Sequence, residues 1–427
     1  MAHLAHHNGL DRRSFLQGLT AASAAATLVP GTSTPARAQG ENTKYETLLK
    51  GGRVVDPSQN LSAVRDIAFA NGKVALIAEN ISPAESRDVH DVTGKLVVPG
   101  LIDDHTHFHW GLTAWQYPPH DFREYGVAAA ADCGSNSANF LNLRDYIIRP
   151  APLHLYAFMH TDLPPATPIP AREKVRRQEL ASTVIAANRD TIVGIKVVLP
   201  GEMDSQETAK PMLDYALQVA GETGVPIMVH INGGMSLATL TDRLRPGDII
   251  THCFHSRQPN ILGPDGKVRA EIRAARQKGI FMDQSVGNQT HLSWRVAQAA
   301  LEQGFPPDII SSDFPNPGPG GTLYTLPDCI SMMLGLGMSI EKAITAATVA
   351  PATGMRKADV LGSLAPGRNG EAAIFDLERG AFPYEDMDNA KRTVNQRLVP
   401  MATVMGGRVA WASTQGRDLR RPKGDRA

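Results

Sequence analysis

Apolar runs of strand length recur along the middle of the chain, separated by a few tens of residues. Eight of them are interpreted as strands: Val97–Ile102, Val127–Ala131, Leu153–Met159, Ile192–Leu199, Pro226–Ile231, Ile249–Phe254, Ile280–Met282 and Asp308–Ser311. Helical patterns lie between several of them, as at Glu207–Glu222, Val268–Lys278 and Ser293–Gln303. Strands that are buried on both faces and alternate with helices are typical of a parallel sheet. The pattern therefore predicts an α/β fold, a closed (β/α)8 TIM barrel over residues 97–359.

Both flanks of this region show a different pattern, with short β-rich runs punctuated by turn residues. The N-terminal runs are Thr47–Val55, Asp66–Phe69, Lys73–Ala78 after an Asn71-Gly72 turn, and Lys95–Val98. The C-terminal runs are Glu371–Asp376, Val394–Leu398 and Ala402–Trp411. We expect the two flanks, residues 44–96 and 360–415, to form one small β-sandwich.

The first 38 residues have the order of an export signal rather than of a folded element. Arg12-Arg13 precedes Phe15-Leu16, an Ala-rich stretch follows at Leu19–Val29, and Ala36-Arg37-Ala38 supplies small residues for a signal peptidase. This order resembles a twin-arginine signal peptide over residues 1–38, which predicts export of the folded protein to the periplasm by the twin-arginine machinery. A flexible N-terminus with a chance arginine pair is the alternative.

Composition narrows the class of protein without indicating a reaction. The 43 Lys and Arg residues balance 43 Asp and Glu residues, which argues against a broad basic surface for nucleic acid. No stretch is apolar for the roughly 18 residues that a membrane span requires. Three cysteines, Cys133, Cys253 and Cys329, cannot form a disulfide framework. Composition does not identify the partner; we expect a small-molecule substrate, and a homo-oligomer stays open.

Polar side chains gather where the predicted barrel strands end. They are His105 and His107 after the first strand, Lys196 in the fourth, His230 at the fifth, His252 at the sixth and Asp313 after the eighth. A single histidine at a strand end is more commonly a hydrogen-bonded structural residue than a ligand. Because the carboxyl ends of barrel strands meet on one rim, their joint placement predicts a single site there.

The spacing of these residues suits metal ions. In His105-Thr106-His107 the two-residue period of a strand directs both imidazoles to the same side. Asp313 follows the eighth strand, which neighbours the first once the barrel closes, so it can complete that ion's shell. His230 and His252 lie on neighbouring strands and can hold a second ion. Imidazole and carboxylate ligands favour zinc, and leave manganese, iron and cobalt open.

Lys196 is the residue that most needs an explanation. It lies within the apolar run Ile192–Leu199, where a bare ammonium group is expensive to desolvate. A lysine that reaches the barrel mouth or pairs with a carboxylate is the structural alternative. The chemical interpretation is that its neutral amine captures carbon dioxide, and that the resulting carbamate bridges two metal ions about 3.5–4 Å apart.

These motifs resemble those of the amidohydrolase superfamily of metal-dependent hydrolases. The resemblance covers nearly all of the chain after residue 38, and it lies in Pro99–His107, Val193–Lys196, Val229-His230, Ile250–His252, Ser311–Asp313 and the exit segment Leu361–Gly367. It implies a TIM barrel with a β-sandwich, two divalent metal ions, and His105, His107, Lys196, His230, His252 and Asp313 as their ligands. It also implies that a metal-bound hydroxide attacks a carbonyl while Asp313 accepts the proton and delivers it to the leaving group.

Within the superfamily, the chain is most similar to bacterial deacetylases that are often mislabelled as dihydroorotases. The residues that carry this likeness are Leu244–His255 and Leu326–Ser331. Such relatives hydrolyse acyl esters or amides of small hydroxy or amino acids. They usually have an Asp-Val-Gly-His-Gly run on strand seven, whereas this chain has Asp283–Asn288 without a histidine. Their specificity is therefore not carried over unmodified.

Several further rim residues are candidates for contact with a substrate. They are His109 and Trp110 after the ligand pair, His255 and Arg257 after His252, and Gln284, with Asn232 and His291 suggested by rim position alone. Arg257 can bind a carboxylate with two hydrogen bonds, although a solvated loop arginine is an equal alternative. For His255, a role in supporting the metal ligands or the fold is at least as favoured as contact with a substrate. We interpret Cys133 as a wall residue, although D-aminoacylase relatives use a cysteine as a ligand.

Three other functions compete with a deacetylase. An N-acyl-D-amino-acid deacylase shares the reaction and differs only in substrate. A dihydroorotase or hydantoinase is disfavoured, because dihydroorotases that resemble this fold have an arginine where this chain has His109. A non-catalytic binding protein is disfavoured as well, because degenerate barrels lose ligands and this chain keeps all six. The acyl group, the leaving group and the stereochemistry stay open.

Overall fold

The computed structural model describes residues 43–109, 119–160, 171–200, 206–315 and 323–417 of the 427-residue chain. The predicted signal segment 1–38 and Trp110 lie outside the described residues. Within these ranges, no helix combines the length and the apolar character that crossing a membrane requires.

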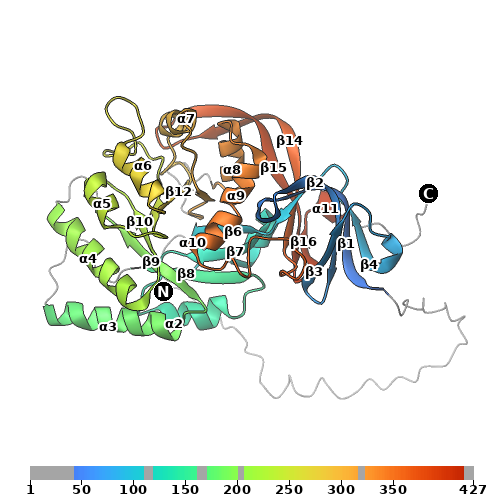
Figure 1. Cartoon of the computed structure of the whole chain (residues 1–427), viewed down its shortest axis with the longest axis horizontal. Coiled ribbons are helices and arrows are strands. Elements are labelled where there is room, and N and C mark those ends of the chain that lie inside the picture. Colours follow the sequence, from blue (N-terminus) through green and yellow to red (C-terminus); the bar gives the residue numbers. More distant parts are fainter. Residues whose placement is uncertain (1–42, 110–118, 161–170, 201–205, 316–322, 418–427) are drawn as a thin grey trace, which may run out of the picture. The chain divides into compact units, whose positions relative to one another are not determined.

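Eight parallel strands form the sheet that carries the predicted ligands (Figure 1). In order they are β6 (Leu101–Thr106), β7 (Val127–Asp132), β8 (His154–His160), β9 (Ile192–Val198), β10 (Ile227–His230), β11 (Ile249–Thr251), β12 (Phe281–Ser285) and β13 (Ile309–Ser311). Each strand pairs in parallel with the next. The amide of Asp313 donates to the carbonyl of His105, and that of His107 donates to the carbonyl of Phe314, both over 2.8 Å. These bonds join the last strand to the first, which confirms the predicted (β/α)8 barrel.

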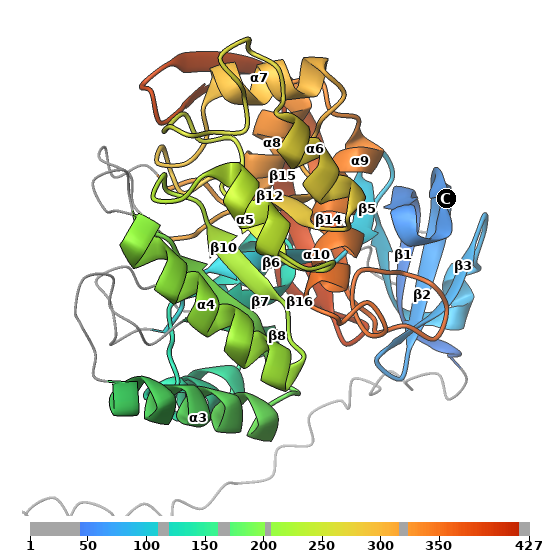
Figure 2. The same ribbon diagram turned by 60° about the vertical axis from the view of Figure 1, so that its left-hand side comes forward.

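Helices cover the outside of the barrel, and Figure 2 shows α3 to α6 along its outer side. The helices of at least six residues are α3 (Ala171–Ala187), α4 (Gln206–Thr223), α5 (Leu237–Arg243), α6 (Ala270–Gln277), α7 (Trp294–Glu302), α8 (Leu326–Gly335), α9 (Ile340–Ala346) and α10 (Val349–Gly354). The other helical elements are α2 (Phe140–Leu143), α11 (Thr414–Arg417), the 3-10 helices η1 (Pro57–Gln59), η2 (Pro83–Glu85) and η3 (Pro119–Tyr125), and the π-helical turn η4 (Arg144–Ile148). The main core, which includes Leu213, Ile227 and Ile272, lies between the strands and this helical layer.

The N- and C-terminal flanks build a second sheet together, as expected. Its strand order is β16-β15-β14-β5-β1-β2-β3, with β4 paired to β1. The strands are β1 (Tyr45–Asp56), β2 (Leu61–Ala70), β3 (Lys73–Ala78), β4 (Ser86–Asp91), β5 (Leu96–Pro99), β14 (Ala372–Glu385), β15 (Lys391–Met405) and β16 (Arg408–Ala412). The predicted Val394–Leu398 strand and the start of Ala402–Trp411 are one strand, β15, and the remainder forms β16. The flanks are thus hydrogen-bonded as one mixed sheet.

The first predicted barrel strand, Val97–Ile102, is divided between the two sheets. Its first half belongs to β5, which pairs with β14, and its second half begins β6 of the barrel. Gly100 stands between them, where a Cβ atom would lie 2.4 Å from the Cβ of Ala128. The prediction was wrong here because a continuous apolar run does not show that the chain changes sheets at a glycine.

Candidate metal centre

The six predicted ligands lie on the carboxyl-end rim of the barrel. They are His105 and His107 at the end of β6, Lys196 in β9, His230 at the end of β10, His252 just after β11 and Asp313 two residues after β13. Four of them, including Lys196 at 2% exposure, are buried, and His107 and His230 are partly buried. Two groups of three side chains each bring one ligand atom of every member within 4.8 Å of the others.

The first group consists of His105, His107 and Asp313. The Nε2 atom of His107 lies 3.0 Å from Asp313 Oδ1, and the Nε2 atom of His105 lies 3.4 Å from the same oxygen. Two imidazoles and one carboxylate oxygen thus converge, as the two-residue period of the strand and the closure of the barrel predicted. One divalent ion fits these donors.

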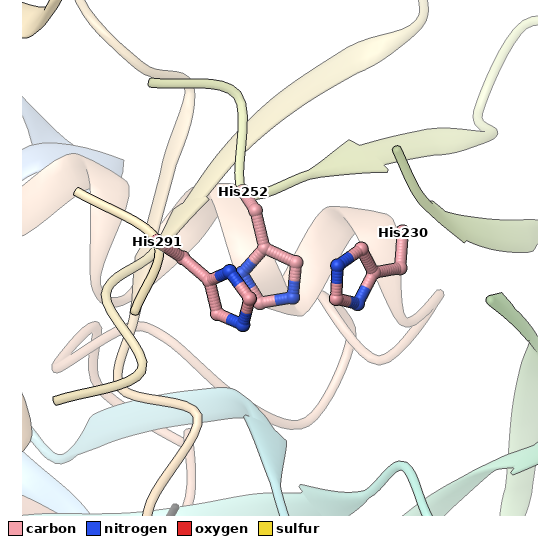
Figure 3. A group of neighbouring side chains, drawn as sticks. All are labelled: His230, His252 and His291. Atoms are coloured by element: carbon pink, nitrogen blue, oxygen red, sulfur yellow. The ribbon is translucent and has the colours of Figure 1, made fainter. Parts of the chain in front are cut away.

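The second group consists of His230, His252 and His291, which point toward one another in Figure 3. The ring centroids of His230 and His252 are 4.2 Å apart, and those of His252 and His291 are 3.8 Å apart. His230 and His252 were expected here. His291 was suggested by its rim position alone, because it lies in the loop after β12, where no strand period indicates its direction.

Lys196 lies beside the first group. Its Nζ atom is 2.5 Å from His105 Nε2, the nitrogen that also faces Asp313. Burial lowers the pKa values of His105, His230 and His252, each well below the usual value. Neutral imidazole is the form that binds a metal ion, so burial prepares these residues as ligands.

The hydrogen bonds of the imidazoles show which nitrogen is available to a metal ion. His252 Nδ1 lies 2.9 Å from the carbonyl oxygen of Ser285, which only accepts, so Nδ1 carries the proton. His105 Nδ1 lies 3.0 Å from Thr251 Oγ1, and that hydroxyl donates to Asp283, so His105 Nδ1 is also the donor. In both rings the Nε2 lone pair is left for a metal ion, as in metal sites where the second nitrogen donates to a neighbouring oxygen.

Two of the ligands have a backbone conformation that is uncommon for their residue types. His252 has a φ of 61° and Asp313 has a φ of 55°, both in the left-handed region. His252 stands directly after β11, and Asp313 stands two residues after β13. Such conformations cost on the order of 1–3 kcal/mol and persist where the surrounding structure holds them, commonly at functional sites.

Buried acids lie beneath the ligand groups. Asp283 accepts hydrogen bonds from Thr251 and Ser311, and Asp103 accepts two from the amide and the hydroxyl of Ser312, while burial raises the pKa of both carboxyls to about 7. Neither carboxylate oxygen of Asp104 has a hydrogen-bond partner among the described residues. Burial thus favours the protonated form of these carboxyls while no cation is bound beside them.

Two residues that were predicted to face a substrate are hydrogen-bonded within the protein. His109 Nδ1 lies 2.6 Å from Ser135 Oγ, and its Nε2 lies 3.2 Å from Asn142 Oδ1. Gln284 is buried, and it accepts from the amide of Phe254 while donating to the carbonyl of His291. These bonds give both side chains a role in holding the rim, and contact with a substrate stays a prediction for them.

The other two candidates face the second ligand group. Arg257 is exposed, and its Nη1 lies 3.3 Å from His291 Nδ1. His255 is fully buried, and neither of its ring nitrogens has a hydrogen-bond partner in the described part of the chain. Burial lowers the pKa of His255 to about 4, helped by the charge of Arg257. Substrate contact stays a prediction for this pair too.

Cys133 belongs to neither ligand group. It is buried, and its Sγ atom lies 3.7 Å from the carbonyl oxygen of Asp104 and 3.9 Å from Met228 Sδ. Burial raises the pKa of its thiol well above the usual value, which disfavours the thiolate that a metal ligand requires. These contacts agree with its interpretation as a wall residue.

Known proteins share this sequence pattern and fold. The amidohydrolase family matches residues 96–410. A deacetylase of Brucella anthropi is 27% identical over 364 residues, which are 83% of this chain and 90% of that protein. Among solved structures, an adenine deaminase superposes with a TM-score of 0.74 at 23% identity, over 86% of this chain and 100% of the other. A dihydroorotase superposes with a TM-score of 0.73 at 24% identity, over 86% and 99%.

Proposed function

The chain belongs to the amidohydrolase family, and we propose that it is a binuclear metal-dependent hydrolase of an acyl amide or ester bond. Its substrate is a small hydroxy- or amino-acid-like molecule. The observation that carries the proposal is the convergence of His105, His107 and Asp313 on one rim with the neighbouring pair His230 and His252, and the buried Lys196 beside them. The similarity to a deacetylase supports acyl transfer to water as the reaction.

Metal ions at these groups would polarise a carbonyl and lower the pKa of bound water toward about 7. Asp313 is the residue placed to move the proton. Its Oδ1 atom faces His105 and His107, while its Oδ2 atom lies 3.6 Å from His291 on the side of the second group. With Oδ1 held as a ligand, the carboxylate accepts the water proton and then delivers it to the leaving nitrogen or oxygen.

We propose zinc as the metal and a carbamate on Lys196 as the bridging ligand. Histidine and carboxylate donors with an open position favour zinc. The neutral amine of Lys196 forms a bond to the carbon of carbon dioxide and releases one proton to solvent, which leaves an anion with two oxygens. The 2.5 Å approach of Nζ to His105 Nε2 supports this assignment, because an ammonium group there gains no acceptor from an imidazole that binds a metal ion.

An N-acyl-D-amino-acid deacylase is the nearest alternative substrate class, since it needs the same chemistry. A cyclic amidase gains no support from His109, because both nitrogens of that ring are bonded to Ser135 and Asn142. Arg257, an exposed residue hydrogen-bonded to His291 of the second group, is the cation placed to meet a substrate carboxylate.

We also propose that residues 1–38 are a twin-arginine signal and that the mature enzyme works in the periplasm. The support is the order of Arg12-Arg13, the Ala-rich stretch and Ala36-Arg37-Ala38. Fractionation of cells that express the full chain, beside an Arg12→Lys, Arg13→Lys variant, tests this. Periplasmic enzyme that is lost in the variant supports export, and equal distribution of both contradicts it.

The hydrolase proposal is tested by metal analysis and a substrate panel. Protein purified after zinc loading should contain two ions per chain, and it should hydrolyse members of a panel of acetyl esters and N-acyl amino acids of both hands. Fewer than one bound ion per chain would exclude the binuclear site. Two ions without turnover of any acyl compound would exclude the reaction.

A further inference from the structure

His291 lies within the site although it is not one of the six predicted ligands. It is 6% exposed, its ring is 3.8 Å from that of His252 and 4.9 Å from that of His230, and its Nε2 is 3.6 Å from Asp313 Oδ2. A third imidazole next to two ligands suggests an additional ligand at first sight. The hydrogen bond on its other nitrogen argues for a different role.

Arg257 determines which nitrogen of His291 carries the proton. A guanidinium group donates only, so Arg257 Nη1 donates to His291 Nδ1 over 3.3 Å, and Nδ1 presents its lone pair. A neutral ring then has its proton on Nε2, which faces Asp313. His291 Nε2 can bind a metal ion only if the Arg257 bond breaks or the ring loses its last proton.

The neighbouring rings have the opposite arrangement. His105 and His252 donate from Nδ1, to Thr251 Oγ1 and to the carbonyl of Ser285, and so present the Nε2 lone pair. Within one cluster, these two rings are oriented to accept a cation. His291 is oriented to present an N–H group.

We propose that His291 is a hydrogen-bond donor to the oxygen that becomes negatively charged when the substrate carbonyl is attacked, and that Arg257 positions it by holding this tautomer. The inference rests on the proposed hydrolase function and identifies a residue for it. His291 transfers no proton: its Nε2–H bond stays intact, while Asp313 accepts and returns the proton of the attacking water. Donors aimed at such developing charge contribute about 10²–10³ in kcat when their position is fixed in advance.

The loop after β12 is built to hold this ring in place. Gln284 donates from Nε2 to the carbonyl of His291 and accepts from the amide of Phe254, so it joins the loop to the segment after β11. At Gly287, with a φ of 60°, a Cβ atom would lie 2.5 Å from His291 Cδ2 and 2.8 Å from Asp313 Oδ2. Only a glycine lets the loop bring the imidazole and the carboxylate together at this point.

The experiment compares zinc-loaded full chains that carry His291→Ala, His291→Gln or Arg257→Met, with His230→Ala as the ligand control. Zinc per chain, kcat and KM for 4-nitrophenyl acetate, and histidine tautomers by ¹H–¹⁵N correlation are measured. We expect His291→Ala to keep two zinc ions and to lose about 10²–10³ in kcat with little change in KM. His291→Gln should recover part of kcat through its amide donor, while His230→Ala should lose zinc.

In wild-type protein the His291 signals should show the proton on Nε2, and Arg257→Met should mix the tautomers and lower kcat without loss of zinc. Loss of one zinc ion in His291→Ala would overturn the inference in favour of a third ligand. Unchanged kcat, or a wild-type proton on Nδ1, would overturn it too. If wild-type enzyme binds two zinc ions but hydrolyses no acyl compound, the proposed function fails, whereas the tautomer and zinc results still decide the assignment of His291 as a donor or a ligand.

Discussion

The two ends of the barrel are both buried, but they differ in what they bury. At the carboxyl end, Lys196 and Asp313 are no more than 3% exposed, and the carboxylate of Asp104 has no partner among the described residues. At the amino end, Phe375 of the mixed sheet is fully buried against Gly126, where a Cβ atom would lie 2.5 Å from its ring.

The carboxyl end of the barrel is built for metal binding and catalysis, whereas the amino end contributes stability. An unsatisfied buried polar group lowers stability by about 1–3 kcal/mol, so the carboxyl end destabilises the fold until cations bind it. Apolar packing at the amino end compensates, because burial of a large side chain stabilises by about 1.5–3 kcal/mol. Changes at the carboxyl end should therefore alter metal binding and turnover, and changes at the amino end should alter the free energy of unfolding alone.

The largest effect is expected from Lys196→Ala. Without the bridging anion the site should lose zinc, and activity should fall by more than the 10–100-fold that is typical of changes behind the ligands. Zinc content and turnover of acetyl esters are the measurements, and a short-chain carboxylate should restore part of the activity. Lys196→Arg, which keeps the cation but cannot form a carbamate, is the matched control and should fail as well. Near-wild-type turnover in either variant would contradict the proposal that Lys196 supplies the bridging ligand.

Asp313→Asn should reduce kcat by about 10²–10⁴. The neutral amide neither binds the metal ion as an anion nor accepts the proton. KM should change much less. Steady-state kinetics at saturating zinc separates the two constants. An unchanged kcat with an altered KM would show that Asp313 does not transfer the proton. It would also weaken the contrast between a carboxyl end that serves catalysis and an amino end that serves stability.

Phe375→Ala tests the amino end. Removing a fully buried ring should lower the free energy of unfolding by about 3–5 kcal/mol. Denaturant titration measures this loss, and Phe375→Leu should lose less. The folded fraction should still bind two zinc ions and keep its kcat. A folded variant with impaired turnover would show that the two ends are coupled.

The smallest effect concerns the pair of His154 and Glu371, where β8 meets the segment before β14. Their side chains lie 2.5 Å apart, and this hydrogen bond raises the pKa of His154 against the opposing effect of burial. A raised folded pKa means that the pair stabilises fully below the unfolded value of about 6.5, and that this contribution is lost as pH rises through the folded pKa.

His154→Gln should therefore lower the free energy of unfolding at pH 5.5 by less than about 1 kcal/mol, since solvent screens a partly exposed pair. The difference from wild type should shrink above neutral pH, while kcat stays unchanged. Unfolding titrations at pH 5.5 and pH 8.5 measure it. A difference that grows with pH would have the wrong sign for this pair.

The rim positions of the candidate ligands could be predicted because each of these residues has a local sequence signal. His105 and His107 share the period of a strand, and Lys196 is a lone charge in an apolar run. His291 left no comparable signal, because a loop has no period that fixes the direction of its side chains. Gln284 and His109 were correctly placed near the rim by chain position, which says nothing about the hydrogen bonds that now hold them.

The barrel, the order of its strands and the gathering of the six candidate ligands on one rim followed from the sequence alone, since periodicity and strand ends are properties of neighbouring residues. Only the folded chain decided that Gly100 divides one apolar run between two sheets, that Gly287 brings His291 against Asp313, and that Arg257 sets the tautomer of His291. Each of these depends on a contact between segments far apart in the chain or on a left-handed turn. Such contacts are set by packing, which a local pattern does not encode.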